Sequence, residues 1–369
     1  MKTYSPKILI LHDWLNTKEG GAEQVFFELL KMYPQADVAT LICNREKFGA
    51  KLGTRRVRTS FLQHFPKKIR ERPELLLPFV RRAVLSISTA GYDIVLASSS
   101  AWVKNAPLSG STKMLVYCYS PARMLWDYWP QALNERTRNP LVKAYVTQLA
   151  SKLRLWDFYS SQEIRREFIA ISRTVAGRIK KFYGRQSAII YPPVHIPPVA
   201  ATDRSDDYMI VSVLAGYKQI DLAIRAFKGT KRKLLIAGDG PERENLEQLA
   251  GSATNIRFLG RVSQADKLKL LSTAQGFIFC NVEDFGIAPV EAIASGAPVV
   301  ALRSGGVTET MQEHVTAEFF DEPMVEQVRQ ALDRVEAQSW DRAKMHRQAN
   351  KFSYEKFRAG IQQAMDKML

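Results

Sequence analysis

The sequence predicts an α/β protein with two doubly wound, Rossmann-like domains, whose parallel sheets we expect to face a central cleft. Continuous apolar runs of strand length alternate with segments of helical length, which is typical of parallel sheets buried on both faces. The series of runs stops at a proline-rich segment and then starts again. A length of 369 residues also favours two domains over one.

The apolar runs place strands on both sides of the proline-rich segment. In the first half the expected strands cover 7–13, 36–42, 92–99, 113–120 and 167–172, and in the second half 208–214, 232–240, 255–262, 275–281 and 297–306. Between them, 189–207 contains four prolines and many polar residues. We therefore expect an N-terminal domain over 1–190, a linker over 191–207 and a C-terminal domain over 208–351. Apolar residues at helical spacing predict a final helix over 352–369.

The positive charge of the chain is concentrated in its first half. The net charge is +16, but residues 1–199 hold 31 Lys and Arg against 14 Asp and Glu, whereas 200–369 hold 22 against 23. Much of the excess lies in 55–83, interleaved with large apolar residues. Such a surface favours an anionic membrane, at about 1 kcal/mol per basic residue near it. A solvated basic face is the next alternative, and nucleic acid comes last because no nucleic-acid-binding motif accompanies the charge.

The sequence contains no pattern of a membrane span or of a metal site. No stretch approaches the roughly 18 consecutive apolar residues of a spanning helix. The opening apolar run is too short for a signal peptide, so we expect the protein in the cytoplasm. Cys43, Cys118 and Cys280 form no CxxC pair and lie in apolar runs, which favours reduced thiols in the core.

Loops that follow the expected strands carry the candidate chemistry, because ligands of open α/β sheets bind at that edge. Gly20 and Gly21 precede a helix, where glycine lets backbone N–H groups approach a phosphate. Lys218 stands between a strand and a helix, in a position to neutralise a diphosphate leaving group. A third loop begins like a dinucleotide fingerprint, but its last glycine position is Arg243, so that fingerprint fails.

The fourth loop, 283–306, places two carboxylates eight positions apart and ends in a glycine pair. Glu283 follows a strand, and Glu291 lies inside a small, apolar helix that begins near Gly286. The N-terminus of a helix carries about half a positive charge and suits a phosphate. A carboxylate further along can accept hydrogen bonds from a ribose diol. Two exposed helix glutamates would not explain why Glu291 stands among Ala, Ile, Val and Gly, so we favour a functional role.

These motifs together resemble the retaining glycosyltransferases of family four, which have the two-domain GT-B fold. The likeness covers nearly the whole chain, and it is similar to the branch of bacterial mannosyltransferases in O-antigen and exopolysaccharide assembly. It implies that the C-terminal helix packs back on the N-terminal domain and that the linker is a hinge. Besides the E-x7-E pattern, its glycine loop and the N-terminal glycine pair, the matching motifs lie at 117–129, 168–184, 191–194, 217–227, 238–242 and 258–262.

The resemblance implies roles for residues on the donor side. Glu291 would hold the ribose hydroxyls, while Glu283 would contact the donor sugar and take part in catalysis together with Lys218. The remaining implied positions are the backbone around Phe285, Gly286 and Ile287 for the diphosphate, Arg261 and Val262 near the nucleobase, and Gly20 and Gly21 in the cleft wall.

On the acceptor side, Asp13, Tyr119 and Arg123 would face the cleft. The sequence departs from the family pattern at three positions. Val213 replaces an arginine, so the diphosphate would depend more on the nearby lysine and on helix ends. Tyr119 replaces a histidine that touches the sugar, which puts that role in doubt. His195 replaces an aspartate after the linker, and we interpret it as an exposed linker residue.

The implied reaction is hexose transfer with retention of the anomeric configuration, in which the departing phosphate oxygen takes the acceptor proton. We expect no metal and no cofactor, because no strand end carries the DxD pair of metal-dependent transferases. The expected partners are a nucleotide sugar, with GDP-mannose preferred to a UDP-hexose, a polyprenyl-diphosphate-linked saccharide and an anionic membrane, but no nucleic acid. The expected location is the inner face of the bacterial inner membrane.

Two other classes of function stay open. A GT-B nucleotide-sugar epimerase is disfavoured because the sequence lacks an extra acid/base cluster. A non-enzymatic basic protein would bind DNA or liposomes in a salt-sensitive manner and would be indifferent to nucleotide sugars.

Overall fold

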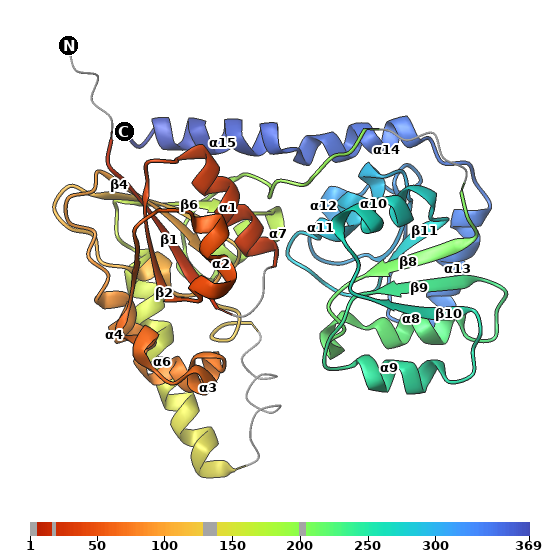
Figure 1. The fold of residues 1–369 in the computed structure, drawn as a ribbon, viewed down its shortest axis with the longest axis horizontal. Coiled ribbons are helices and arrows are strands. Elements are labelled where there is room, and N and C mark those ends of the chain that lie inside the picture. Colours follow the sequence, from red (N-terminus) through yellow and green to blue (C-terminus); the bar gives the residue numbers. More distant parts are fainter. Residues whose placement is uncertain (1–5, 17–19, 128–138, 199–203) are drawn as a thin grey trace. The chain divides into compact units, whose positions relative to one another are not determined.

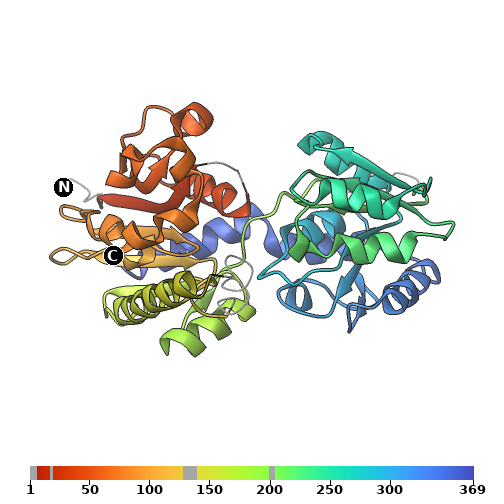
Figure 2. The same ribbon diagram turned by 90° about the horizontal axis from the view of Figure 1, so that it is seen from below.

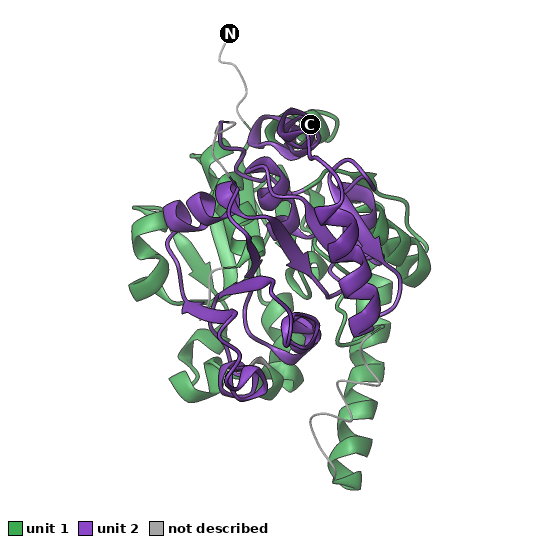
Figure 3. Ribbon diagram, turned by 90° about the vertical axis from the view of Figure 1, so that its right-hand side faces the viewer, with its two compact units in different colours: residues 1–191, 358–369 green, residues 192–357 purple. Residues whose placement is uncertain are grey.

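The chain divides into two compact units. The computed structural model describes residues 6–16, 20–127, 139–198 and 204–369 (Figure 1). Unit 1 comprises Met1–Tyr191 and Arg358–Leu369, and unit 2 comprises Pro192–Phe357. Figure 3 shows the two units in different colours.

Unit 1 is built around a seven-stranded parallel sheet with the order β3-β2-β1-β4-β5-β6-β7. Helices lie on both sides of this sheet (Figure 2). The strands are β1 (Ile8–Leu15), β2 (Asp37–Cys43), β3 (Val57–Thr59), β4 (Ile94–Ser99), β5 (Lys113–Cys118), β6 (Arg166–Ala170) and β7 (Ala188–Ile189). The helices are α1 (Gly21–Met32), α2 (Arg45–Leu52), η1 (Phe61–His64), α3 (Lys67–Arg70), η2 (Pro73–Leu76), α4 (Leu77–Leu85), η3 (Val103–Asn105), α6 (Pro140–Ser161) and α7 (Arg173–Tyr183).

Unit 2 is built around a six-stranded parallel sheet with the order β10-β9-β8-β11-β12-β13. Its strands are β8 (Asp207–Val211), β9 (Lys233–Ala237), β10 (Ile256–Gly260), β11 (Gly276–Phe279), β12 (Val299–Leu302) and β13 (Ala317–Phe320). Its helices are η4 (Gly216–Lys218), α8 (Ile220–Phe227), α9 (Arg243–Ala250), α10 (Gln264–Thr273), α11 (Ile287–Ala294), α12 (Val307–Thr310), α13 (Val325–Glu336), α14 (Arg342–Ala349) and η5 (Asn350–Phe352).

The central strands are buried along nearly their whole length. Every residue of β4 is buried, and β1 is buried except at Trp14, which is half-buried. Strands that are covered on both faces need apolar side chains at successive positions, which is why they appear in the sequence as continuous apolar runs. The three cysteines are buried free thiols, as their apolar surroundings predicted.

Each sheet has one point at which the strand order reverses. The chain first builds outward from β1 to β2 and β3, and then returns to place β4 on the other side of β1. In unit 2, β8 is followed outward by β9 and β10, and β11 then pairs with the other side of β8. Loops after the two central strands diverge at such a point and leave a crevice at the carboxyl edge of the sheet, where ligands bind.

The C-terminal helix α15 (Tyr354–Asp366) begins in unit 2 and continues into unit 1. In unit 1, Arg358 Nε donates to Oε1 of Glu28 over 2.6 Å, and Lys113 Nζ donates to the carbonyl oxygen of Met368 over 2.6 Å. The Glu28 side chain is 1% exposed, so the Arg358 contact neutralises a buried carboxylate.

The segment before β8 packs on the end of unit 2. The backbone N–H of Val194 donates to the carbonyl of Phe352 over 2.8 Å, and His346 Nε2 contacts the carbonyl of Pro197 over 2.9 Å. His195 is exposed, as the sequence analysis expected.

Candidate functional site

Lys218 and Glu283 meet at the reversal point of the unit 2 sheet. Lys218 ends the short helix η4 after β8, and Glu283 follows β11, the strand that pairs with β8. The Nζ of Lys218 forms an ion pair with Oε1 of Glu283, and Nδ2 of Asn281 donates to the same oxygen over 3.2 Å. The two side chains are 14% and 28% exposed. The fold thus joins two candidate residues that are 65 positions apart in sequence.

The glycine pair after β12 holds the backbone of this loop. The N–H of Gly306 donates to the carbonyl of Glu283 over 2.8 Å. A Cβ atom at Gly305 would lie 2.4 Å from that carbonyl oxygen, and one at Gly306 would lie 2.4 Å from Cα of Phe285. Such distances exclude a side chain, because the neighbouring atoms belong to the backbone. The glycines therefore fix the position of the Glu283–Phe285 segment.

Gly286 leads from this loop into α11. Its φ is +89°, a left-handed conformation that glycine adopts without strain. The preceding Phe285 side chain is 3% exposed and packs edge-on against Phe352, with ring centroids 5.5 Å apart. The first backbone N–H groups of a helix lack intrahelical partners. The diphosphate role proposed for the backbone at Phe285, Gly286 and Ile287 rests on these groups and stays a prediction.

Glu291 is buried in α11 and paired with a lysine that the sequence analysis missed. The Nζ of Lys267, on α10, lies 2.7 and 2.8 Å from the two carboxylate oxygens. Glu291 is 8% exposed, and the Lys267 side chain is 14% exposed. A carboxylate has about four lone-pair sites, so this pairing leaves acceptor capacity on both oxygens. Lys267 carried no sequence signal, because it lies in an ordinary helical segment 24 residues before its partner.

Two further glycines lock the loops after β8 and β9 together. A Cβ atom at Gly238 would lie 1.8 Å from the carbonyl oxygen of Ser212, and one at Gly240 would lie 2.3 Å from that of Leu214. The N–H of Glu242 also donates to the Leu214 carbonyl over 3.0 Å. Close packing of two backbones explains these glycines without a bound dinucleotide.

Arg261 and Val262 follow β10 at the same edge of the sheet. The Arg261 side chain is 80% exposed, and its Nε lies 3.6 Å from Oδ2 of Asp239. Val262 is half-buried. Their placement near a nucleobase stays a prediction.

Asp13, an acceptor-side candidate, lies near the end of β1 and is buried. The side chain is 1% exposed, and its carboxylate accepts the backbone N–H groups of Ser100, Ala101, Trp102 and Val103 over 2.6 to 2.9 Å. A carboxylate that receives four backbone donors anchors the loop after β4, and its contact with an acceptor stays a prediction. The carboxylate satisfies N–H groups that would otherwise be buried without acceptors.

A network of hydrogen bonds surrounds Tyr119 in unit 1. The Tyr119 hydroxyl donates to the carbonyl of Ala22 over 2.9 Å and lies 2.9 Å from Oγ of Ser98. Nδ1 of His12 lies 3.0 Å from that Oγ and 3.2 Å from the Ser98 carbonyl. His12, Ser98 and Tyr119 are thus linked in one hydrogen-bond network, in which the role of Nδ1 as donor or acceptor depends on the tautomer of the imidazole. Burial raises the pKa of Tyr119 and keeps its hydroxyl protonated.

The other nitrogen of His12 faces Glu23, one turn into α1. Nε2 lies 3.8 Å from Oε1 of Glu23, and Oε2 accepts the N–H of Gly20 over 2.7 Å. Burial raises the pKa of Glu23, but the contacts with His12 and Gly20 outweigh it and leave the pKa below the ordinary value of 4.5. The ionised Glu23 therefore caps the turn at Gly20 and Gly21. The sequence analysis named the glycines but not His12 or Glu23.

Arg123, the third acceptor-side candidate, lies in the loop after β5. Its side chain is 43% exposed, and its Nε lies 3.7 Å from Oδ1 of Asp127. Oδ2 of Asp127 also binds Nε of Arg178, on α7, over 3.0 Å. Contact with an acceptor stays a prediction.

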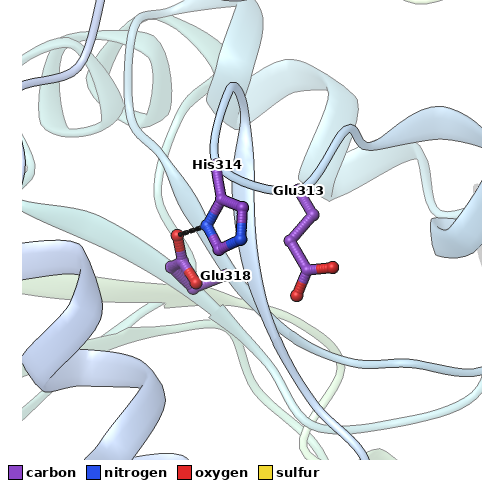
Figure 4. Close-up of side chains that lie close together, drawn as sticks. All are labelled: Glu313, His314 and Glu318. Atoms are coloured by element: carbon purple, nitrogen blue, oxygen red, sulfur yellow. Dashed lines mark hydrogen bonds and ion pairs between the residues drawn. The ribbon is translucent and has the colours of Figure 1, made fainter.

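The described residues bring three potential metal ligands together in unit 2 (Figure 4). Ligand atoms of Glu313, His314 and Glu318 lie within 4.8 Å of one another. Arg303 binds both oxygens of Glu313, which lowers the pKa of that carboxylate, and Arg334 Nε binds Glu318 over 2.9 Å. Each carboxylate is already neutralised by an arginine, so the contacts favour an ion-pair cluster over a metal site.

The basic segment 55–83 divides into an inner and an outer part. Leu62 and Leu76 are fully buried in unit 1, whereas Leu75 and Phe79 are 48% and 43% exposed. The exposed basic side chains beside them include those of Lys67, Lys68, Arg72, Arg81 and Arg82. Within the described parts of the chain, no helix has the length and apolar character needed to span a bilayer.

Part of unit 2, including the paired residues, is similar to a known protein family. Residues 197–352 match the family described as Glycosyl transferases group 1. This segment lies inside unit 2 and contains Lys218, Glu283 and Glu291.

Several glycosyltransferases are similar in sequence. The D-rhamnosyltransferase WbpZ of Pseudomonas aeruginosa is 30% identical over 112 residues, which is 29% of each chain. The alpha-1,3/1,6-mannosyltransferase ALG2 of Mus musculus is 23% identical over 100% of this chain and 98% of its own. A GDP-mannose-dependent alpha-(1-6)-phosphatidylinositol monomannoside mannosyltransferase of Mycobacterium tuberculosis is 32% identical over 33% of this chain and 36% of its own. The matches to WbpZ and to the mycobacterial enzyme therefore span less than half of those proteins.

Solved structures share the fold over nearly the whole chain. HepE of Anabaena, in complex with UDP, superimposes with a TM-score of 0.70 at 16% identity, over 98% of this chain and 100% of its own. The sucrose-phosphate synthase of Thermosynechococcus elongatus gives a TM-score of 0.72 at 16% identity, over 98% and 99% of the two chains. These likenesses confirm the predicted fold of two parallel-sheet α/β domains of the GT-B type.

Proposed function

We propose that this protein is a retaining glycosyltransferase that transfers mannose from GDP-mannose to a lipid-linked saccharide of a bacterial surface polysaccharide. One observation carries the proposal. In the domain that matches glycosyl transferases group 1, the carboxyl edge of the sheet holds two cation–carboxylate pairs, Lys218 with Glu283 and Lys267 with Glu291.

The diphosphate of the donor would bind between Lys218 and the first turn of α11. Lys218 is a flexible cation at the crevice where α/β sheets bind ligands, and its side chain is 14% exposed. An arriving diphosphate would compete with Glu283 for its ammonium group. Release from Lys218 would leave Glu283 free to accept hydroxyl groups of the donor sugar. On donor binding, the ion pair between Lys218 and Glu283 would thus be replaced by contacts of Lys218 with the diphosphate and of Glu283 with the sugar.

The ribose would bind at Glu291. Its carboxylate is held in one orientation by Lys267 and keeps acceptor sites on both oxygens. The lysine also compensates the charge, so a nearly buried carboxylate stays ionised next to a diol. Hydrogen bonds to an ionised acceptor are stronger than those to a neutral one.

The transfer itself requires that charge on the leaving diphosphate be stabilised. The bond between the anomeric carbon and the phosphate oxygen breaks, and a bond from that carbon to the acceptor oxygen forms on the same face. The acceptor proton passes to the departing phosphate oxygen. Lys218 and the N-terminus of α11 supply positive potential where negative charge develops, and we propose that they do so without a metal ion.

The choice of donor is supported by the names of similar proteins. ALG2 and the mycobacterial relative are mannosyltransferases, and the latter is described as GDP-mannose-dependent. A UDP-hexose is the second candidate, because HepE, which shares the fold, is described in complex with UDP-glucose.

We further propose that the protein works on the inner face of the bacterial inner membrane. The outer part of 55–83 combines exposed basic side chains with the exposed Leu75 and Phe79, the combination that favours an anionic lipid surface. A polyprenyl diphosphate acceptor would lie at that surface.

The decisive experiment is a thermal-shift panel of GDP-, UDP- and dTDP-sugars, followed by release of the nucleoside diphosphate with an extracted lipid acceptor. A ligand at 100 times its dissociation constant stabilises a fold by about 2.7 kcal/mol. GDP-mannose should give the largest shift, and turnover should persist in EDTA. A thermal shift with UDP-sugars alone would mean that the donor is a UDP-sugar and not GDP-mannose. Turnover that is lost in EDTA would contradict the metal-free mechanism. No thermal shift with any nucleotide sugar would refute the proposal.

A further inference from the structure

Unit 1 contains a pocket, lined mainly by polar and charged residues, that the proposed donor site does not use. It lies at the carboxyl ends of β1 and β2, between the starts of α2 and α3, and has a volume of about 310 Å³. Small-molecule sites begin at roughly 300 Å³. Its position at the carboxyl edge of a parallel sheet is the usual place for a ligand.

Three cations line this pocket. They are Arg45, at the first position of α2, and Lys67 and Arg70, at the two ends of α3. Among the residues that the structure describes, none of the three forms an ion pair. Lys67 and Arg45 are exposed, and Arg70 is half-buried.

Arg70 differs from two other half-buried arginines, Arg55 and Arg58, in that its guanidinium has no acceptor among the described residues. Its Nε is buried and forms no hydrogen bond with the described residues. Arg55 and Arg58 also have buried, unpaired Nε atoms, but their terminal nitrogens donate to backbone carbonyls. A buried donor without a partner is costly, which points to an acceptor supplied by a ligand.

Amide side chains around the pocket hold its backbone segments in place through hydrogen bonds. Asn16 Nδ2 donates to the carbonyl of Arg70 and ties α3 to the end of β1. Gln63 bonds both backbone groups of Cys43, and the Asn44 side chain caps α2. These contacts fix the backbones that carry the three cations.

We propose that this pocket binds the phosphate or diphosphate ester of the acceptor saccharide. The inference rests on the proposed function and gives it an acceptor subsite. Guanidinium and ammonium groups that converge on one pocket match the oxygens of a phosphate ester. The carboxylates of Glu46 and Glu71 also line the pocket and would accept hydroxyl groups of the attached sugar.

The first test uses inorganic pyrophosphate as the probe in calorimetric titrations of the full chain. The titrations are carried out in the presence of saturating GDP, which occupies the proposed donor site and keeps it from contributing. Lys67→Gln and Arg70→Gln should each weaken binding about tenfold or more, because each removes a charged hydrogen bond. Lys68→Gln is the matched control, since it removes the same charge from α3 but does not line the pocket. Lys67 is exposed, so its variant tests the proposal even if Arg70→Gln fails to fold.

Two further binding measurements distinguish a soluble phosphate ester from a lipid-linked one. One measures binding of soluble mannose 1-phosphate, and the other measures binding to phosphatidylcholine vesicles that contain a polyprenyl diphosphate. A Lys67→Gln loss in the soluble arm supports a free sugar phosphate, and a loss in the vesicle arm supports a lipid-linked one, each judged against Lys68→Gln.

Equal losses in Lys67→Gln and Lys68→Gln would overturn the proposal and show diffuse surface charge. Absence of pyrophosphate binding in the presence of saturating GDP would overturn it as well. Nucleotide-sugar binding is measured separately on the unmodified chain. Absence of nucleotide-sugar binding would refute the proposed glycosyltransferase function, whereas a negative pyrophosphate test would refute only the acceptor subsite.

Discussion

Replacement of Glu291 gives the sharpest test of the donor site. The side chain is 8% exposed, and both of its oxygens bind Lys267 Nζ. Glu291→Gln keeps the shape of the side chain and removes its charge, whereas Glu291→Ala removes both. Either change should weaken the binding of GDP, because the ribose loses an ionised acceptor.

The expected loss follows from the kind of hydrogen bond. Bonds to a charged group contribute about 1.5–3 kcal/mol each, so Glu291→Ala should weaken GDP binding roughly ten- to hundredfold. Glu291→Gln should lose less, because its amide oxygen still accepts. Isothermal titration calorimetry with GDP measures both affinities. The alanine variant should also unfold earlier, because Lys267 then lies 14% exposed without its counter-ion.

Glu313→Ala is the matched control for this experiment. It also removes a carboxylate that is paired with a basic residue of unit 2, here Arg303, but it lies outside the proposed site. Its GDP affinity should equal that of the unmodified protein. Unchanged GDP affinity in Glu291→Ala would refute the ribose assignment. If Glu313→Ala lost as much GDP affinity as Glu291→Ala, the loss would reflect a general effect of charge or stability and not a contact with the ribose.

Three further changes test other parts of the structure. Lys218→Ala should lower kcat more than donor affinity, because its charge matters most as the diphosphate departs; the opposite pattern in steady-state kinetics and calorimetry would contradict that role. Gly306→Ala should cost about 1–3 kcal/mol in chemical denaturation, since its Cβ would meet backbone atoms at 2.4 Å, whereas Gly177→Ala, with open space around it, should not destabilise. The pKa of Glu23 is lowered in the folded state, so its ionised form stabilises unit 1 at neutral pH, and this contribution is lost as pH falls below 4.5. The stability difference from Glu23→Gln should therefore shrink in acid denaturation profiles, and a difference that grows would reverse the sign of the shift.

Burial explains most, but not all, of the strands that the sequence predicted. All ten predicted strands exist, and most of them are apolar runs that are covered on both faces of the sheet. The edge strand β10 was also predicted, although Ile256 is its only buried residue. The predicted runs were too long where polar residues or glycines follow a strand, as in 297–306, of which only Val299–Leu302 is strand. Strands β3 and β7 lie at the sheet edges and are exposed or half-buried, so they lacked that signal. The short β13 was missed as well.

The residues of the candidate site also divide into those that the sequence indicates and those that only the fold reveals. Glu283, Glu291 and Lys218 could be selected because each interrupts an apolar or small-residue context after a strand. Lys267 could not, because its importance arises from a contact between α10 and α11 that only the fold creates. Asp13 followed the same rule as the others, yet its carboxylate is used by the loop after β4. A polar residue at a strand end therefore indicates the edge at which ligands bind, but it does not distinguish a ligand contact from a loop anchor.

The path of α15 has a practical consequence for dissecting this protein. A fragment cut after residue 191 would lack Arg358, and the buried carboxylate of Glu28 would lose that partner. A fragment cut after residue 353 would carry the same defect. Anyone who wishes to study the N-terminal half alone should therefore splice residues 358–369 back onto it through a designed linker, or supply them as a separate peptide, before drawing conclusions from its behaviour.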